Sequence, residues 1–157
     1  MARTLLLLLL VTLAGCQATG PAALNELVAS NTTGLTDTSG DTPDWVELAN
    51  TSSSEVDLTG WFLSDDAGNP NRHALDGLTL PADGYLILLA SGDTTLGGDH
   101  LPFKLSAEGE QLVLSSPDGI VDAVNYGPQE ADVAYARLPD GDGEWAAATP
   151  TPGAANE

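Results

Sequence analysis

Cations are the scarcest feature of this 157-residue chain. Only four residues are lysine or arginine, against 23 aspartates and glutamates, so the formal net charge at pH 7 is −19. Binding to nucleic-acid phosphates needs a basic patch, which four scattered cations do not form. The same shortage excludes a polybasic contact with a membrane surface. The acidity fits either a high-salt habitat or a calcium-rich exterior, and composition does not choose between them.

Cysteine is nearly absent as well, since Cys16 is the only one in the chain and has no disulfide partner. It follows Arg3, an unbroken apolar run from Leu5 to Val11, and two small residues, Ala14 and Gly15. A positive start, a short apolar run and small residues before a cleavage site predict a signal peptide over residues 1–15. The apolar stretch is too short for a spanning helix, which needs about 20 residues.

The sequence Leu13-Ala14-Gly15-Cys16 resembles the bacterial lipobox. The resemblance implies that Cys16 becomes the first mature residue and carries acyl chains such as palmitate, with a short spacer over residues 17–23. The alternative is an ordinary secretory signal with a chance cysteine, but a lone thiol in an oxidising compartment would be reactive, whereas a thioether would not. A lipid-anchored protein of the cell envelope is therefore expected. By resemblance to proteobacterial sorting, Gln17 in place of an aspartate favours the outer membrane over the inner membrane.

The mature chain of 142 residues is the size of one domain and keeps three cations, Arg72, Lys104 and Arg137, for a net charge of −20. Long amphipathic helical patterns and internal repeats are missing. Short runs with apolar residues at every second position, such as Val46/Leu48, predict strands instead. The expected strands are Leu24–Ala29, Trp45–Ala49, Val56–Leu58, Trp61–Ser64, Tyr85–Ala90, Phe103–Leu105, Gln111–Ser115, Ile120–Tyr126 and Val133–Leu138.

Turn-forming segments separate these runs, for example Ser-Pro-Asp-Gly at 116–119. Asn31–Asp44 is expected to be a long surface loop, or partly disordered, and Thr149–Glu157 an extended tail that completes the domain. Roughly seven to nine short strands predict an all-β sandwich or barrel.

Two kinds of residue stand out against this alternation. Tryptophan is too large to leave in solvent, so at least two of Trp45, Trp61 and Trp145 should seal the sandwich. Asp122 falls on the same face as Val124 and Tyr126. Either a bulge turns it outward, or it is buried and paired, in which case Arg137 is the natural partner.

Several short segments follow one another in a distinctive order. They are Leu24–Ser30, Asp44–Asn50, Asp57–Asp65, Phe103–Ser106, Glu110–Leu114, Asp122–Gly127, Arg137–Gly141, Trp145 and Thr151–Asn156. Together they resemble the lamin-tail domain, which implies an immunoglobulin-like β-sandwich over residues 24–157 and a role as an attachment or interaction module. In bacteria such domains often accompany membrane-associated nucleases and phosphoesterases, but here the chain stops after the domain, so no attached enzyme is expected.

Catalytic motifs are missing. The chain has no Gly-x-Ser-x-Gly segment, and its two histidines, His73 and His100, stand in loop-like contexts where solvent-exposed side chains are expected. The pair Asp65-Asp66 reads as a solvated turn. Nucleotide binding has no support, because no glycine-rich loop joins a strand to a helix.

Metal binding is the one ligand question that the sequence leaves open. The oxygens of Asp140, Asp142 and Glu144 alternate along a loop and form a weak candidate for calcium, but the spacing is not that of an EF-hand. A turn on an acidic surface is the favoured reading, and no cofactor is expected.

Two functions follow from these features. The favoured one is a membrane-anchored, non-catalytic interaction domain that displays loops or a sheet edge to an envelope protein or polymer. The alternative is a structural or ion-binding acidic surface lipoprotein without a specific protein partner.

Overall fold

The structure is a computed structural model that describes residues 18–157, so the expected signal peptide and Cys16 lie outside the described residues. In the described part every regular element is a strand. The eleven strands are β1 (Ala22–Val28), β2 (Asp44–Asn50), β3 (Val56–Asp57), β4 (Phe62–Ser64), β5 (His73–Ala74), β6 (Thr79–Leu80), β7 (Tyr85–Ala90), β8 (Glu110–Ser116), β9 (Gly119–Tyr126), β10 (Ala134–Leu138) and β11 (Glu144–Ala148).

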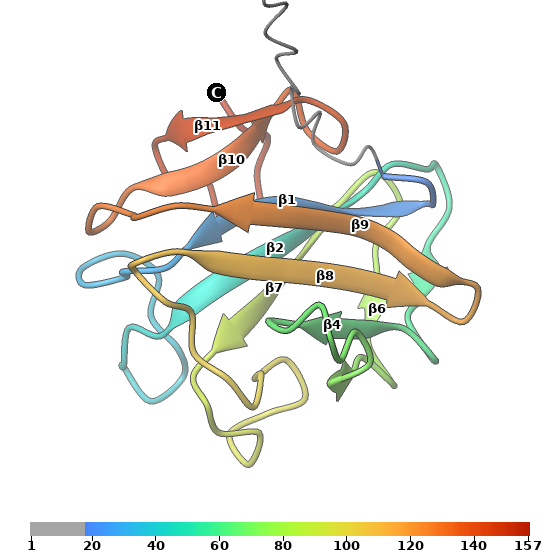
Figure 1. Ribbon diagram of the computed structural model, residues 1–157, viewed down its shortest axis with the longest axis horizontal. Coiled ribbons are helices and arrows are strands. Elements are labelled where there is room, and N and C mark those ends of the chain that lie inside the picture. Colours follow the sequence, from blue (N-terminus) through green and yellow to red (C-terminus); the bar gives the residue numbers. More distant parts are fainter. Residues whose placement is uncertain (1–17) are drawn as a thin grey trace, which may run out of the picture.

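The strands form two main layers. A five-stranded antiparallel sheet has the order β11-β10-β1-β2-β7, and a four-stranded antiparallel sheet has the order β5-β4-β8-β9. In Figure 1 the four-stranded sheet lies in front of the five-stranded one, and β3 and β6 form a small separate pair. The predicted all-β, immunoglobulin-like sandwich is confirmed.

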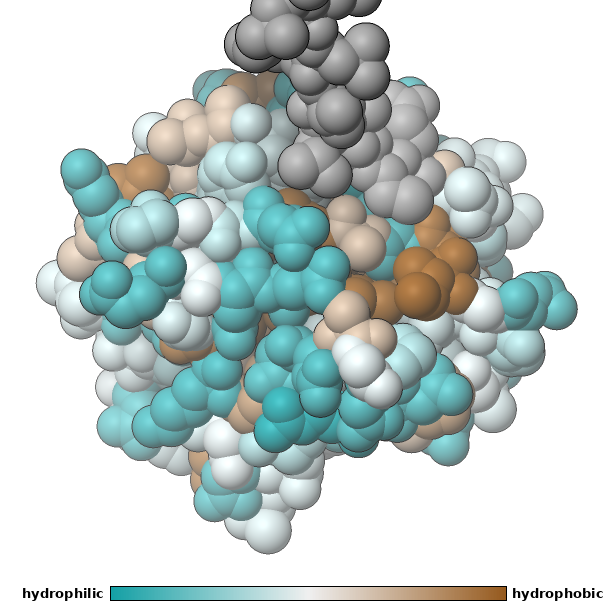
Figure 2. Space-filling view, viewed as in Figure 1, coloured by the Kyte–Doolittle hydropathy of each residue, from teal (hydrophilic) through white to brown (hydrophobic). Residues whose placement is uncertain are grey.

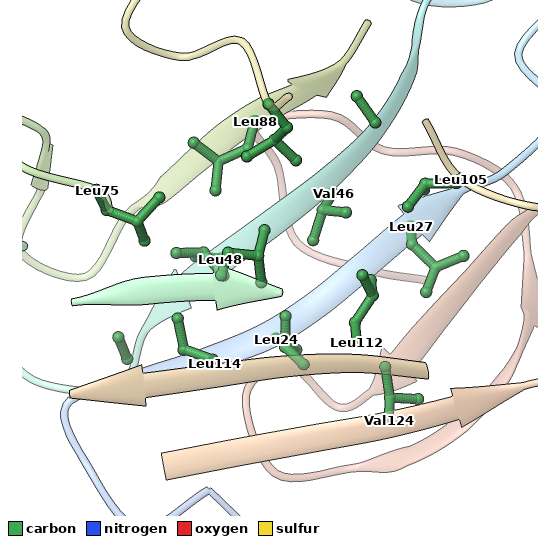
Figure 3. Packing of buried hydrophobic residues seen from close by; sticks show 14 of the residues in the cluster. Leu24, Leu27, Val46, Leu48, Leu75, Leu88, Leu105, Leu112, Leu114 and Val124 are labelled. Carbon is green, nitrogen blue, oxygen red and sulfur yellow. The ribbon is translucent and has the colours of Figure 1, made fainter. Parts of the chain in front are cut away.

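Leucine and valine side chains fill the space between the two sheets. Leu24 on β1 and Leu48 on β2 point toward Leu112 and Leu114 on β8, as Figure 3 shows, and all four are fully buried. These residues occupy alternate positions of their strands, so one face of each strand enters the core. The period-two pattern of the sequence therefore located the core correctly.

The strand assignments differ from the expectations at four places. Phe103–Leu105 is not a strand, although Phe103 and Leu105 are buried in the core, so that prediction was wrong about backbone conformation. Strands β5, β6 and β11 were not expected. The first two have only two residues each, and β11 (Glu-Trp-Ala-Ala-Ala) lacks the β-branched residues that mark a strand.

Of the two alternatives for Asp122, the structure shows the buried pair with Arg137. Both side chains are buried, and Nη2 of Arg137 lies 2.8 and 3.0 Å from the two carboxylate oxygens of Asp122. The backbone N–H of Leu24 donates to the same carboxylate at 2.9 Å, and Nε of Arg137 donates to the carbonyl of Leu24 at 2.9 Å. The pair thus joins β9 to β1 and β10 at the seam between the two sheets.

The first described residues are bonded to the sandwich. The N–H of Thr19 donates to the carbonyl of Val121 at 3.0 Å, and Thr51 donates its N–H to Pro21 at 2.9 Å and its hydroxyl to Gly20 at 3.1 Å. Strand β1 then begins at Ala22 rather than at Leu24. Much of the expected spacer over residues 17–23 is therefore part of the folded domain. Residues 18–157 contain no helix that is long and apolar enough to cross a membrane.

Candidate functional site

The loop Asn31–Asp44 connects β1 to β2 at one end of the sandwich, on the left in Figure 1. Its first residue, Asn31, is buried, and its side-chain amide donates to the carbonyls of Leu35 and Pro43, both at 2.7 Å. The N–H of Asn31 donates to the carboxylate of Asp44 at 3.0 Å. One asparagine therefore holds the two ends of the loop together.

Asp132, in the connection between β9 and β10, ties the same loop to the rest of the domain. Its carboxylate accepts hydrogen bonds from the N–H groups of Thr32 and Thr33 at 2.7 and 3.0 Å, and from their hydroxyls at 2.6 and 2.8 Å. These four donors hold the pKa of Asp132 well below its usual range. Of the two states expected for this segment, the structure shows a hydrogen-bonded surface loop.

A hollow of about 240 Å³ lies between this loop and the C-terminal tail, and its lining is mostly apolar. Leu35 comes from the loop, Val28 and Trp45 from β1 and β2, and Pro150 and Pro152 from the tail. The stretch from β1 to β2 and the distant tail thus meet around one small apolar hollow.

The tryptophan expectation is confirmed, because Trp61 lies in the core between the sheets and the partly buried Trp145 packs against that core. Trp61 is 7% exposed and belongs to the core between the sheets, whereas Trp45, 1% exposed, belongs to a separate cluster with Val28 and Leu89. This second cluster lies on the outer face of the five-stranded sheet. Trp145 is only partly buried, and its ring stacks on that of Tyr135 with 5.3 Å between ring centroids.

A more open hollow on the other side of the loop has a different character. It measures about 490 Å³, and its lining includes Asp37, Asp41, Asp44 and Asp93 with Lys104. Burial raises the pKa of Asp44, although the N–H of Asn31 and the charge of Lys104 oppose the rise. The loop therefore separates an acidic hollow from an apolar one.

The tail covers the outer face of the five-stranded sheet beside Trp45 and is bonded to two buried carboxylates. The N–H of Thr151 donates to Glu26 at 2.9 Å, and the N–H of Gly153 donates to Glu47 at 2.6 Å. Glu26 and Glu47 are fully buried. Burial raises the pKa of Glu26, and it raises the pKa of Glu47 to about 7, because the charged form loses its hydration.

The candidate calcium loop is divided between the interior and the surface. The Asp140 carboxylate accepts hydrogen bonds from Tyr85 Oη at 2.6 Å, from the N–H of Asn156 at 3.0 Å and from the Asn25 side chain at 3.3 Å. Asp142 and Glu144 are exposed. Across residues 18–157, no three histidine, cysteine or acidic side chains are grouped so as to hold a metal ion. Asp140 thus fixes the tail, and the geometry adds no support for calcium.

The histidines do not match the expectation of exposed side chains. His100 is 4% exposed, and its Nδ1 lies 2.9 Å from the Ser91 hydroxyl, so that expectation was wrong. His73, on β5, is half-buried, and burial lowers its pKa. At the expected solvated turn, Asp65 pairs with Arg72 and Asp66 accepts the N–H of Gly68. Both acidic side chains serve the local turn structure.

Sequence reasoning missed the polar layer beneath the tail. Glu47 stands between the apolar Val46 and Leu48, which is a local sign that both faces of β2 are buried, whereas Glu26 follows the polar Asn25 and carries no such sign. The role of Asp132 left no such sign, because its partners lie about 100 residues earlier in the chain.

One family of known proteins matches this arrangement. A family model described as Lamin Tail Domain matches residues 17–128, which span β1 to β9. Strands β10 and β11 and the tail lie beyond the matched residues, although β10 pairs with β1 in the same sheet. No curated protein and no solved structure matches the chain.

Proposed function

The chain belongs to the lamin tail domain family, a non-catalytic immunoglobulin-like family, and we propose that it is an interaction domain anchored to the cell envelope by a lipid on Cys16. Its partner is an envelope protein or polymer that docks at the loop end of the sandwich, over the apolar hollow beside Trp45. Binding of this partner is the proposed function, and the lipid anchor determines that the binding takes place at the cell envelope.

The hollow beside Trp45 is the observation that supports binding at this end. An apolar depression with a few polar groups at its rim is a common form of recognition site. Here Leu35, Pro150 and Pro152 supply apolar contact, and the hydrogen bonds of Asn31 and Asp132 keep the loop in one conformation. A loop that is already ordered loses little entropy when a partner binds.

The lipobox-like segment supports the anchor. Cys16 is the only cysteine, and a thioether-linked lipid there would leave the mature protein without a free thiol. Acyl chains contribute about 0.8 kcal/mol per buried CH₂, so two or more chains hold a domain that has no basic membrane-binding patch.

The binding surface is tested with a soluble Cys16→Ser bait against detergent-solubilised envelopes. Pro152→Glu places a charge at the rim of the hollow, and Pro117→Glu makes the same change at another exposed proline, in the β8–β9 turn at the opposite end. Capture of one stoichiometric partner should be lost with Pro152→Glu and kept with Pro117→Glu. Equal capture by both variants would contradict the proposed surface, and absence of any stoichiometric partner would favour an acidic surface lipoprotein.

The anchor is tested separately by flotation of the full chain with lipid vesicles after expression in a bacterial host. The unchanged chain should incorporate labelled fatty acid and float, and Cys16→Ser should do neither. Flotation of the serine variant would show that membrane association has another cause.

A further inference from the structure

Large hydrophobic side chains are rarely exposed in residues 18–157, and Ile120, at 55%, is the most exposed of them, followed by Leu96 at 46%. Ile120 is the second residue of β9 and directly follows the turn from β8. Ile120 lines a hollow of about 310 Å³ together with Trp61, Val121, residues 19–21 and the turn residues 116–119. Figure 2 shows a compact hydrophobic patch beside the start of β9, on a face that is otherwise mostly hydrophilic.

The N-terminal residues run directly past this patch. Thr19 donates its N–H to the carbonyl of Val121, the residue after Ile120. Only two residues stand between Cys16 and Thr19, and three residue steps reach at most ~11 Å even when fully extended. A lipid on Cys16 therefore begins within ~11 Å of a residue that is bonded to β9 beside Ile120.

We infer that the exposed rim formed by Ile120 and Pro117 rests on the bilayer that holds the lipid of Cys16. This inference rests on the proposed lipid anchor and adds an orientation to it. The lipid on Cys16 keeps this rim close to the membrane. A bilayer is therefore the surface that the anchor itself places against the patch. The exposed Asp118 beside Ile120 disfavours anionic headgroups, and the rim therefore suits the interface of a neutral lipid.

The orientation also fits the place of the proposed binding surface. Strand β1 carries the chain from Ala22, next to the tether, to Val28, which lines the hollow beside Trp45 at the other end. Leu96 lines the acidic hollow at that same far end. With Ile120 against the lipid, the loop Asn31–Asp44 points away from the membrane.

The test uses the lipidated full chain in phosphatidylcholine vesicles, with an environment-sensitive fluorophore on Ile120→Cys. Because the Cys16 thiol is consumed by the lipid, the introduced cysteine is the only free thiol. Leu96→Cys is the matched control, since Leu96 is similarly exposed but lies at the far end. The water reference for each site is the same label in a Cys16→Ser background without vesicles.

At position 120 the emission should shift to shorter wavelength in vesicles, and quencher-bearing lipids should reduce it. At position 96 the emission should match the water reference. A vesicle-bound protein whose label at 120 also matches the water reference overturns the inference while leaving the anchor intact, as do equal shifts at both sites. Failure of the protein to float with the vesicles overturns the anchor itself, so the two failures are distinguishable.

Discussion

The two faces of the five-stranded sheet both bury carboxylates, but they stabilise them in different ways. On the inner face, Asp122 of the opposite sheet is paired with Arg137 of β10. On the outer face, Glu26 and Glu47 accept N–H groups of the tail, and neither takes part in an ion pair within residues 18–157.

This difference has an electrostatic consequence. A cation compensates the charge of a buried carboxylate directly, whereas N–H dipoles compensate it only in part when burial has removed the water. The pKa of Glu47 is accordingly raised to about 7 despite its hydrogen bonds to Gly153 and Asn25. Burial also raises the pKa of Asp122, although the charge of Arg137 and the N–H of Leu24 oppose the rise. Both faces should therefore respond to pH, and the pKa of about 7 for Glu47 puts the response of the outer face near neutral pH.

Breaking the Asp122–Arg137 pair should cause the largest loss of stability. Asp122→Ala leaves the buried Arg137 charge uncompensated, which costs about 3–5 kcal/mol of unfolding free energy. The control is Asp65→Ala, which breaks the partly exposed pair with Arg72 and should cost about 1 kcal/mol or less. Both are measured by urea denaturation. Equal losses would show that burial does not distinguish the two pairs.

On the outer face, the raised pKa of Glu47 predicts a pH-dependent stability. An acid whose folded-state pKa lies above its unfolded value stabilises the fold fully below pH 4.5, and that stabilisation is lost as pH rises through about 7. Since each pH unit between the two pKa values is worth about 1.4 kcal/mol, roughly 2–3 kcal/mol should be lost between pH 5 and pH 8.

Glu47→Gln should remove this part of the pH dependence, and Glu144→Gln, at an exposed position, should leave it unchanged. The measurement is unfolding free energy at a series of pH values. If the stability of Glu47→Gln changes with pH as much as that of the unchanged chain, other acidic residues cause the pH response.

Removal of the tail also tests the difference between the two faces, and its expected effect on the free energy of unfolding is smaller. Without residues 149–157, water reaches Glu26 and Glu47, and hydrogen bonds worth about 0.5–1.5 kcal/mol each are exchanged for hydration. We expect a net loss on the order of 2 kcal/mol at pH 5 and less at pH 8, because the neutral form of Glu47 is no longer favoured. Unfolding should stay cooperative, since the leucine core is untouched. An equal loss at both pH values would contradict this account of the outer face.

Added ions should have the smallest specific effect on stability. Screening of the net charge of −19 should raise the melting temperature in sodium chloride, and calcium at the same ionic strength should add no further rise. The basis is that Asp140 is engaged with Tyr85 and Asn156. A large additional rise with calcium that Asp142→Asn abolishes would establish the loop as a calcium site.

Much of the inner layer was predictable because its signals are local. Alternation placed Leu48 and Leu112 in the core, and the apolar position of Asp122 pointed to Arg137 as its partner. The apolar hollow was not predictable, since Leu35, Trp45 and Pro152 meet only after the loop and the tail have folded over the sheet. The burial of His100 was also missed, because it depends on hydrogen bonds between the backbone of Leu89 and the residues on either side of His100.

The sequence by itself determined the sandwich and its leucine face, because side chains in a strand alternate between two faces wherever the strand lies. Only the tertiary structure decided what covers the outer face and how its carboxylates are satisfied. The backbone N–H groups that the tail donates to Glu26 and Glu47 come from residues more than 100 positions away. Every residue except proline carries such a donor, so no side-chain pattern distinguishes Thr151 and Gly153 as partners before the chain is folded.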